Sequence, residues 1–104
     1  MRVTEVGMKP LRALLEAHRD DIKALVARHG GESVSVFGSV ARGDEASGSD
    51  IDFLVELAPG TRPIEILAIG AELEELLGVS VDVGTPGSLR ERLRDEVLAE
   101  AIAL

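Results

Sequence analysis

The chain has 104 residues, enough for one compact domain, so we expect residues 1–104 to form a single domain. Hydrophobic residues make up 45% of it, which argues against disorder, and the absence of cysteine excludes disulfides, thiolate metal sites and a cysteine nucleophile and fits a cytoplasmic protein. The formal net charge of −8 disfavours direct binding to nucleic acid, and no apolar run approaches the roughly 20 residues of a membrane-spanning helix.

The chain begins with a predicted helix. Pro10 occupies a first helical turn, and leucine, isoleucine and valine then recur at helical spacing until the glycine pair at Gly30 ends the helix. His18 and His29 lie three turns apart on this helix. That separation is too large for a shared metal ion, so we expect both histidines at the surface.

The residue pattern in the middle of the chain predicts three strands and a second helix. Residues 32–37 alternate and are rich in β-branched side chains, which predicts the first strand. Residues 50–57 predict a second, stronger strand. Residues 63–77 then predict a helix with Gly78 as its C-terminal cap, and the valines of residues 79–83 predict a third strand.

The last segment predicts a C-terminal helix. Ser88 and Glu91 have the spacing of a capping box, and apolar residues continue at helical spacing as far as Ile102. The predicted order is helix, strand, strand, helix, strand, helix. This order indicates an α/β (α+β) fold in which a small sheet is covered by helices.

Acidic residues occupy the polar faces of two predicted strands. Asp50 and Asp52 point to the same face, about 6.5–7 Å apart along the backbone, so their carboxylates can converge on a hard cation such as Mg²⁺. Asp82 points away from the valines of the third strand. It lies on the same face as Asp50 and Asp52 if the second and third strands are neighbours. Taken alone, such residues are more often just the polar face of a half-exposed strand.

A second group of candidate residues follows the first strand. Gly38 allows close backbone approach, and Ser39 can open a short helix whose N–H groups and hydroxyl meet a phosphate. Arg42 lies one turn later and can reach the same phosphates. A serine cap after a glycine turn is the common structural alternative.

The two groups together point to one protein family more specifically than either group does alone. Gly38-Ser39, ten residues, and then Asp50-x-Asp52 resembles the signature of the DNA polymerase β-like nucleotidyltransferase superfamily. The flanking residues, Gly-Ser-x-Ala-Arg-Gly from position 38 and Ser-Asp-x-Asp from position 49, resemble more narrowly its minimal nucleotidyltransferase (MNT) group.

The resemblance implies a polymerase β-like fold with a mixed sheet of three to four strands. It also implies ATP as substrate and Mg²⁺ as cofactor, with two ions. The catalytic and metal-binding residues would be Asp50, Asp52 and Asp82, and the nucleotide would contact Gly38, Ser39, Arg42 and Ser49.

Small MNT proteins resemble the antitoxin half of HEPN/MNT toxin–antitoxin pairs. This resemblance implies transfer of AMP from ATP to a tyrosine of a HEPN toxin, and a hetero-oligomer with that partner. Two alternatives remain open. One is a binding module that neutralises its partner by complex formation, and the other is a nucleotidyltransferase for a small hydroxylated molecule of the aminoglycoside type, against which the short chain argues.

Overall fold

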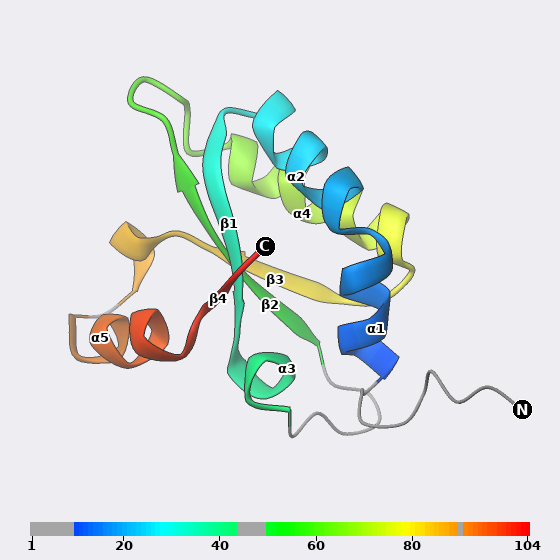
Figure 1. Ribbon diagram of the computed structural model, residues 1–104. Helices are drawn as coiled ribbons and strands as arrows, with labels where there is room; N and C mark the ends of the chain where they lie inside the picture. Colours follow the sequence, from blue (N-terminus) through cyan, green and yellow to red (C-terminus); the bar gives the residue numbers. More distant parts are fainter. Residues whose placement is uncertain (1–9, 44–49, 90) are drawn as a thin grey trace, which may run out of the picture.

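The computed structural model describes residues 10–43, 50–89 and 91–104, and these build a mixed α/β fold. Along the chain the elements are α1 (Pro10–Ala17), α2 (Arg19–Arg28), β1 (Gly31–Phe37), α3 (Gly38–Arg42), β2 (Ile51–Leu57), α4 (Glu65–Leu77), β3 (Val81–Gly84), the 3₁₀ helix η2 (Pro86–Ser88), α5 (Glu91–Glu100) and β4 (Ile102–Ala103). Helices α1, α2 and α4 lie on one side of the sheet, and α5 lies on the other (Figure 1). None of the helices in the described ranges is long and apolar enough to cross a membrane.

The sheet is mixed and has four strands in the order β3-β2-β1-β4. Strand β1 runs antiparallel to β2 and to β4, whereas β2 and β3 are parallel. Parallel neighbours need a long crossover, and α4 provides it between β2 and β3. The predicted fold class, a small mixed sheet flanked by helices, is therefore confirmed.

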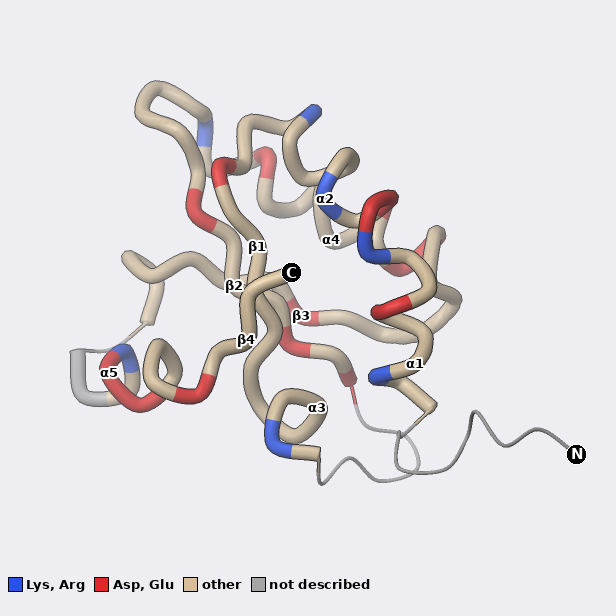
Figure 2. Tube along the Cα trace, viewed as in Figure 1, with Lys and Arg blue, Asp and Glu red and all other residues tan. Residues whose placement is uncertain are grey.

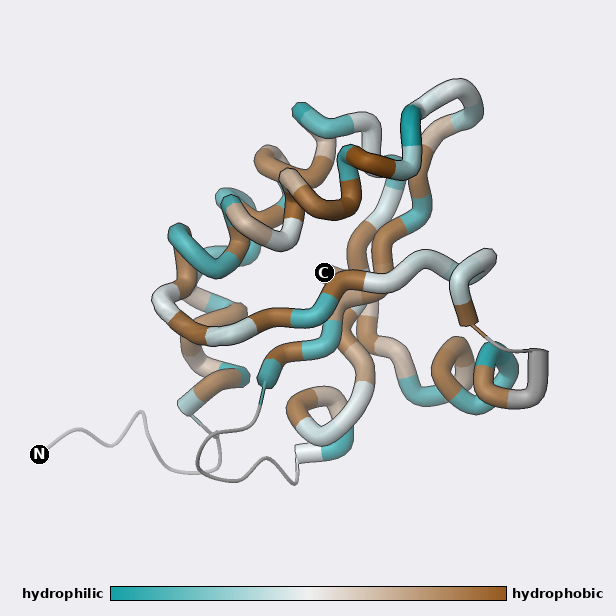
Figure 3. Tube along the Cα trace, turned by 180° about the vertical axis from the view of Figure 1, so that it is seen from behind, coloured by the Kyte–Doolittle hydropathy of each residue, from teal (hydrophilic) through white to brown (hydrophobic). Residues whose placement is uncertain are grey.

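The core is aliphatic apart from Phe53, and it lies between the sheet and the helices of one side. Ile51, Phe53 and Val55 alternate along β2 and are fully buried, and they belong to the same packed cluster as Ile22 of α2 and Ile69 of α4. Figure 3 shows the hydrophobic residues gathered along the strands and on the helices beside them. Burial of a side chain as large as Phe53 stabilises the fold by roughly 1.5–3 kcal/mol.

The predicted single N-terminal helix is wrong, because the structure divides it at His18 into α1 and α2. The backbone bonds of both helices meet at this residue, where His18 N–H donates to the Leu14 carbonyl over 3.2 Å and the His18 carbonyl accepts from Ile22 N–H over 2.9 Å. Leu15 before the junction and Ile22 after it are both buried. The bend thus lets both segments keep an apolar face on the core, and the regular spacing of apolar residues gave no sign of it.

The C-terminal segment also differs from the prediction. Ser88 does not cap α5; it ends η2 and exchanges hydrogen bonds with Thr85, whose N–H donates to Ser88 Oγ over 3.0 Å. The helix ends at Glu100, and Ile102 lies in the short strand β4 beside Val36 of β1. A strand of two residues is too short to show a period in the sequence, so only its pairing with β1 defines it.

Candidate active site

The centre of the site is a pair of carboxylates on neighbouring parallel strands. Asp52 of β2 is the register partner of Asp82 of β3, and Asp50 immediately precedes β2. Asp52 is half-buried, while Asp50 and Asp82 are exposed. Figure 2 shows the acidic positions of β2 and β3 next to each other in the sheet. The sheet thus brings together the three aspartates that were predicted from the sequence to be catalytic.

The environment of Asp52 shows how close these charges are. Burial raises the pKa of the Asp52 carboxyl, and the negative charges of Asp82 and Asp50 raise it further. The positive charge of Arg42 acts on the pKa of Asp52 in the opposite direction. The protein therefore concentrates negative charge at one point of the sheet, and a bound cation would relieve the repulsion.

These carboxylates fit a magnesium ion by their chemistry, because Mg²⁺ prefers oxygen ligands and is commonly held by one or two carboxylates together with substrate phosphates. Within residues 10–43, 50–89 and 91–104, no three acidic or histidine side chains already surround a common cation position. A divalent ion held here would thus draw part of its coordination from the substrate, which is the usual way in which proteins bind Mg²⁺ at phosphate-transfer sites.

Gly38 makes room for the Asp52 carboxylate. It follows β1 directly and has a φ of +75°, which side-chain-bearing residues rarely adopt. A Cβ atom on Gly38 would overlap with Oδ2 of Asp52. The glycine is required here for two reasons, its backbone conformation and the close approach of the carboxylate.

The predicted phosphate-binding residues lie on α3, directly after Gly38. Ser39 is the second residue of this short helix and is half-buried, and Arg42 is its last residue and is exposed. The same helix packs against both β1 and β2, which places it beside the acidic strands. Ser49, the remaining predicted nucleotide contact, lies outside the described residues.

The sequence analysis missed one residue of this site, Glu100. This glutamate ends α5, and its Oε1 atom accepts a hydrogen bond from Gly38 N–H over 3.2 Å and another from Arg42 Nη1 over 3.0 Å. The separation of about 60 residues between the partners leaves no local pattern to detect, and Glu100 resembles any charged residue on a helix surface.

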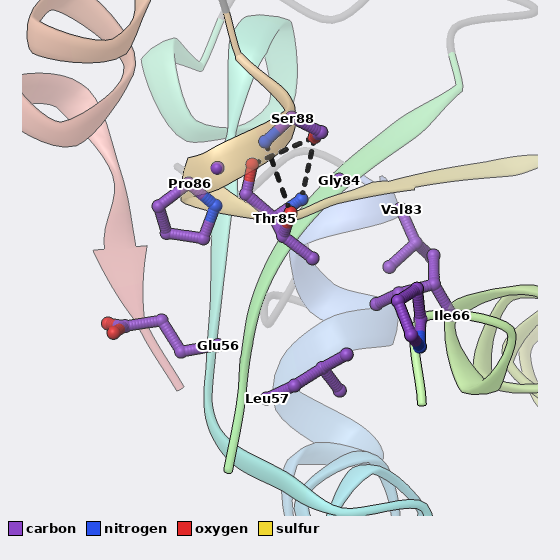
Figure 4. A pocket seen from close by; sticks show the side chains of 10 residues that line it. Glu56, Leu57, Ile66, Val83, Gly84, Thr85, Pro86 and Ser88 are labelled. Atoms are coloured by element: carbon purple, nitrogen blue, oxygen red, sulfur yellow. Dashed lines mark hydrogen bonds between the residues drawn. The ribbon is translucent and has the colours of Figure 1, made fainter. Parts of the chain in front are cut away.

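A hollow of about 540 Å³ opens elsewhere on the surface (Figure 4). Its walls come from the end of β2, from the start of α4 and from the segment that leads from β3 into η2, and they include Leu57, Ile66, Val83 and Pro86. None of the three predicted catalytic aspartates lines it. Asp82 instead lines a smaller hollow of about 250 Å³, which shares Ile66 and Val83 with the larger one. Sequence reasoning had predicted neither hollow.

The two histidines do not share a site, but only one is a simple surface residue. His18 lies 3.4 Å from Asp21 through its Nδ1 atom and is partly exposed. His29 is held by two carboxylates of α4, with Nδ1 at 2.8 Å from Glu65 and Nε2 at 2.5 Å from Glu72. His29 is thus partly exposed, like His18, but it also joins the end of α2 to α4, a contact that the sequence did not predict.

Comparison with known proteins agrees with this geometry. Residues 15–104 match the model of a family described as "Nucleotidyltransferase domain". The protein adenylyltransferase MntA of Thermococcus cleftensis is 30% identical over 95 residues, which cover 91% of this chain and 93% of the relative. A Methanocaldococcus jannaschii protein, provisionally named a protein adenylyltransferase, is 41% identical over 78 residues, covering 75% of this chain and 84% of the relative.

Solved structures share the fold. One that is described provisionally as a minimal nucleotidyltransferase superposes with a TM-score of 0.80 at 44% identity, covering 88% of this chain and 94% of that one. Another, an MNT antitoxin in complex with a tri-AMPylated HEPN toxin of Shewanella oneidensis, has a TM-score of 0.64 at 20% identity, covering 85% of this chain and 69% of that one. At that identity the second likeness concerns the fold alone.

Proposed function

Because the chain belongs to the nucleotidyltransferase domain family, we propose that it is a protein adenylyltransferase that acts as an antitoxin. Its reaction is the Mg²⁺-dependent transfer of AMP from ATP to a hydroxyl, that of a tyrosine, on a partner toxin of the HEPN type. The observation that carries this proposal is the register of Asp52 beside Asp82, with Gly38 against the Asp52 carboxylate.

The nucleotide is held by two groups of residues. Asp50, Asp52 and Asp82 would hold magnesium together with the substrate phosphates, and the ion would supply positive charge for the phosphates and for the attacking and leaving oxygens. Ser39 and the backbone around Gly38 bind the β- and γ-phosphates. The guanidinium of Arg42 supplies a positive charge to the same phosphates, as arginine does in many phosphate sites.

The transfer step is an in-line displacement at the α-phosphorus. The acceptor hydroxyl oxygen forms a bond to the α-phosphorus while the bond from that phosphorus to the bridging oxygen of the β-phosphate breaks, and pyrophosphate leaves with the electron pair. Asp82, which is exposed, orients the acceptor hydroxyl and receives its proton. An exposed carboxylate suits an acceptor that is carried by another protein, since no added domain is needed to reach it.

The partner is inferred from the relatives. The MntA relative shares the domain over nearly its whole length, and solved structures of the same fold include an MntA–HepT toxin–antitoxin complex. One neighbour is a toxin–antitoxin structure that contains AMP-PNP, an ATP analogue. These names support ATP as donor and a toxin protein as acceptor for this chain. The net charge of −8 also suits a basic partner.

The proposal is tested by incubating the purified protein with Mg²⁺ and ATP, with and without the protein encoded next to it. Intact mass spectrometry should show mass gains in AMP steps on that neighbour, and peptide mapping should place them on tyrosine. The Asp50→Asn/Asp52→Asn variant should give no gain. Transfer at a near-normal rate by this variant, if it is folded, would overturn the assignment of the site.

Two other functions predict different outcomes. A binding module would neutralise its partner without any mass gain, and substitution of all three aspartates would leave neutralisation intact. A small-molecule transferase would label a hydroxylated compound instead of a protein. The hollow of about 540 Å³ is large enough for such a compound, but none of the predicted catalytic aspartates lines it. The hollow that Asp82 lines measures about 250 Å³, below the roughly 300–1,000 Å³ of small-molecule pockets, which favours the protein acceptor.

A further inference from the structure

We propose that Glu100 is an internal competitor of the nucleotide, and that its carboxylate takes the place of a phosphate on α3 until ATP displaces it. The inference rests on the proposed function, because it assumes that Gly38 and Arg42 bind the triphosphate. It adds a residue outside the two motifs described above, Gly38 to Gly43 and Ser49 to Asp52, and this residue controls the affinity of the site.

Glu100 is bound to α3 in the geometry of a phosphate oxygen. A single oxygen, Oε1 of Glu100, accepts a hydrogen bond from the Gly38 backbone N–H at 3.2 Å and from the Arg42 guanidinium at 3.0 Å. An anionic oxygen that receives one backbone N–H and one guanidinium N–H is bound in the way that proteins bind phosphate oxygens. Both donors come from the segment to which the proposed function assigns the β- and γ-phosphates.

The negative charge of Glu100 occupies Arg42. A triphosphate that approached Arg42 with Glu100 in place would meet a carboxylate already paired with that guanidinium. The ion pair is partly exposed, with Arg42 49% and Glu100 34% accessible at the side chain, so its own stability is small. A polyphosphate carries several negative charges, and can therefore replace one weakly held carboxylate.

The sheet keeps Glu100 close to α3. It is the last residue of α5, and β4 begins two residues later and pairs with β1, where Ile102 is the partner of Val36. The pairing keeps the carboxylate near α3 whether or not it is bonded. The Glu100 carboxylate is therefore present at high effective concentration beside α3. Its displacement requires only that this side chain moves, and the sheet stays folded.

The test compares the affinity for AMP-PNP and for inorganic triphosphate, each with Mg²⁺, by isothermal titration calorimetry. Glu100→Gln removes the charge and keeps the size of the side chain. Glu96→Gln is the matched control, because Glu96 is an exposed glutamate of the same helix and the net charge changes equally. We expect Glu100→Gln to bind both ligands about threefold or more tightly than the wild type, and Glu96→Gln to bind as the wild type does.

Salt gives a second readout, since the gain should shrink as ionic strength rises and screens the exposed charges. If the wild type binds nucleotide and Glu100→Gln binds it equally or more weakly, the proposal that Glu100 competes with the nucleotide is wrong. The proposed function is then unaffected. Failure of the wild type and of both variants to bind any nucleotide would overturn the proposed function and this inference together. Thermal unfolding of each variant checks that it is folded.

Discussion

Asp52 and Asp82 face each other across the one parallel pair of strands in the described sheet, and the charge of Asp82 helps to raise the pKa of Asp52. The arrangement is unfavourable for a protein without a bound cation, because it places two like charges side by side and partly buries one of them. Stability and function therefore make opposite demands on these residues, and the two can be separated by experiment.

Asp52→Asn should lower the rate of AMP transfer strongly without loss of stability. Removal of one carboxylate that helps to hold the cation should lower AMP transfer by about 10²–10³-fold, or about 2.7–4 kcal/mol of transition-state stabilisation. The unfolding midpoint in the absence of Mg²⁺ should stay unchanged or rise, because a neutral amide ends the repulsion with Asp82. Rate assays and thermal unfolding measure the two effects.

Glu56→Gln is the control for this variant. Glu56 lies on β2, four residues after Asp52, and is exposed. The substitution removes the same charge from the same strand, and we expect a normal transfer rate. A comparable loss of activity in Glu56→Gln would show that net charge, and not the carboxylate at position 52, determines the rate.

Gly38→Ala should damage both folding and the site. Alanine at a φ of +75° costs about 1–2 kcal/mol, and its Cβ atom would also displace the Asp52 carboxylate. We expect a lower urea midpoint together with transfer at less than a tenth of the normal rate. Gly43→Ala separates the two causes, since Gly43 has a φ of +78°, but no atom of the described residues, its chain neighbours apart, lies within 4 Å of its added Cβ. It should lose stability and retain the chemistry; an equal loss of activity would contradict a specific role for the space at position 38.

The acidic pair could be predicted from the sequence because its determinants are local. Alternation along β2 places Asp52 opposite the buried residues, and alternation along β3 does the same for Asp82. A strand–helix–strand segment then favours parallel neighbours joined by α4. The glycine cap of α4 was predicted on equally local grounds, and Gly78 indeed has a φ of +73°.

The features that were missed depend on contacts between distant residues. Glu100 reaches Gly38 only because β4 returns the C-terminal segment to β1, and the two residues of β4 carry no period of their own. His29 meets Glu65 and Glu72 because α2 and α4 pack against the same side of the sheet. Sequence periodicity predicts which face of an element is buried, and it does not predict which polar side chains meet.

Phe53 should be the most costly residue of the core to truncate. It is fully buried at the centre of β2, so Phe53→Ala leaves a cavity and should lower the free energy of unfolding by about 3–5 kcal/mol. Leu67→Ala is the comparison, since Leu67 on α4 is 71% exposed and should change stability by less than about 0.5 kcal/mol. Urea denaturation of both variants measures the difference, and equal effects would contradict the assigned core.

His29 gives the protein a stability that depends on pH. Its hydrogen bonds to Glu65 and then to Glu72 raise its pKa above the ordinary value of 6.5, and the bond from His29 lowers the pKa of Glu72 below its ordinary 4.5. The protonated imidazole bridges two carboxylates that lie two turns apart on α4. Breaking either contact therefore loosens the end of α2 from α4.

The pH range of this contribution follows from the direction of the two shifts. The stability supplied by His29 is fully present below pH 6.5 and is lost as pH rises through the raised pKa, while that supplied by Glu72 is present above pH 4.5 and is lost as pH falls through the lowered pKa. We expect His29→Gln to lower the urea midpoint most between these two values and to reduce the decline of stability on the alkaline side. Glu75→Gln, an exposed change on the same helix, should retain the wild-type profile. Equal destabilisation by His29→Gln at pH 5.5 and at pH 9 would show that the ring acts by packing and not by its charge.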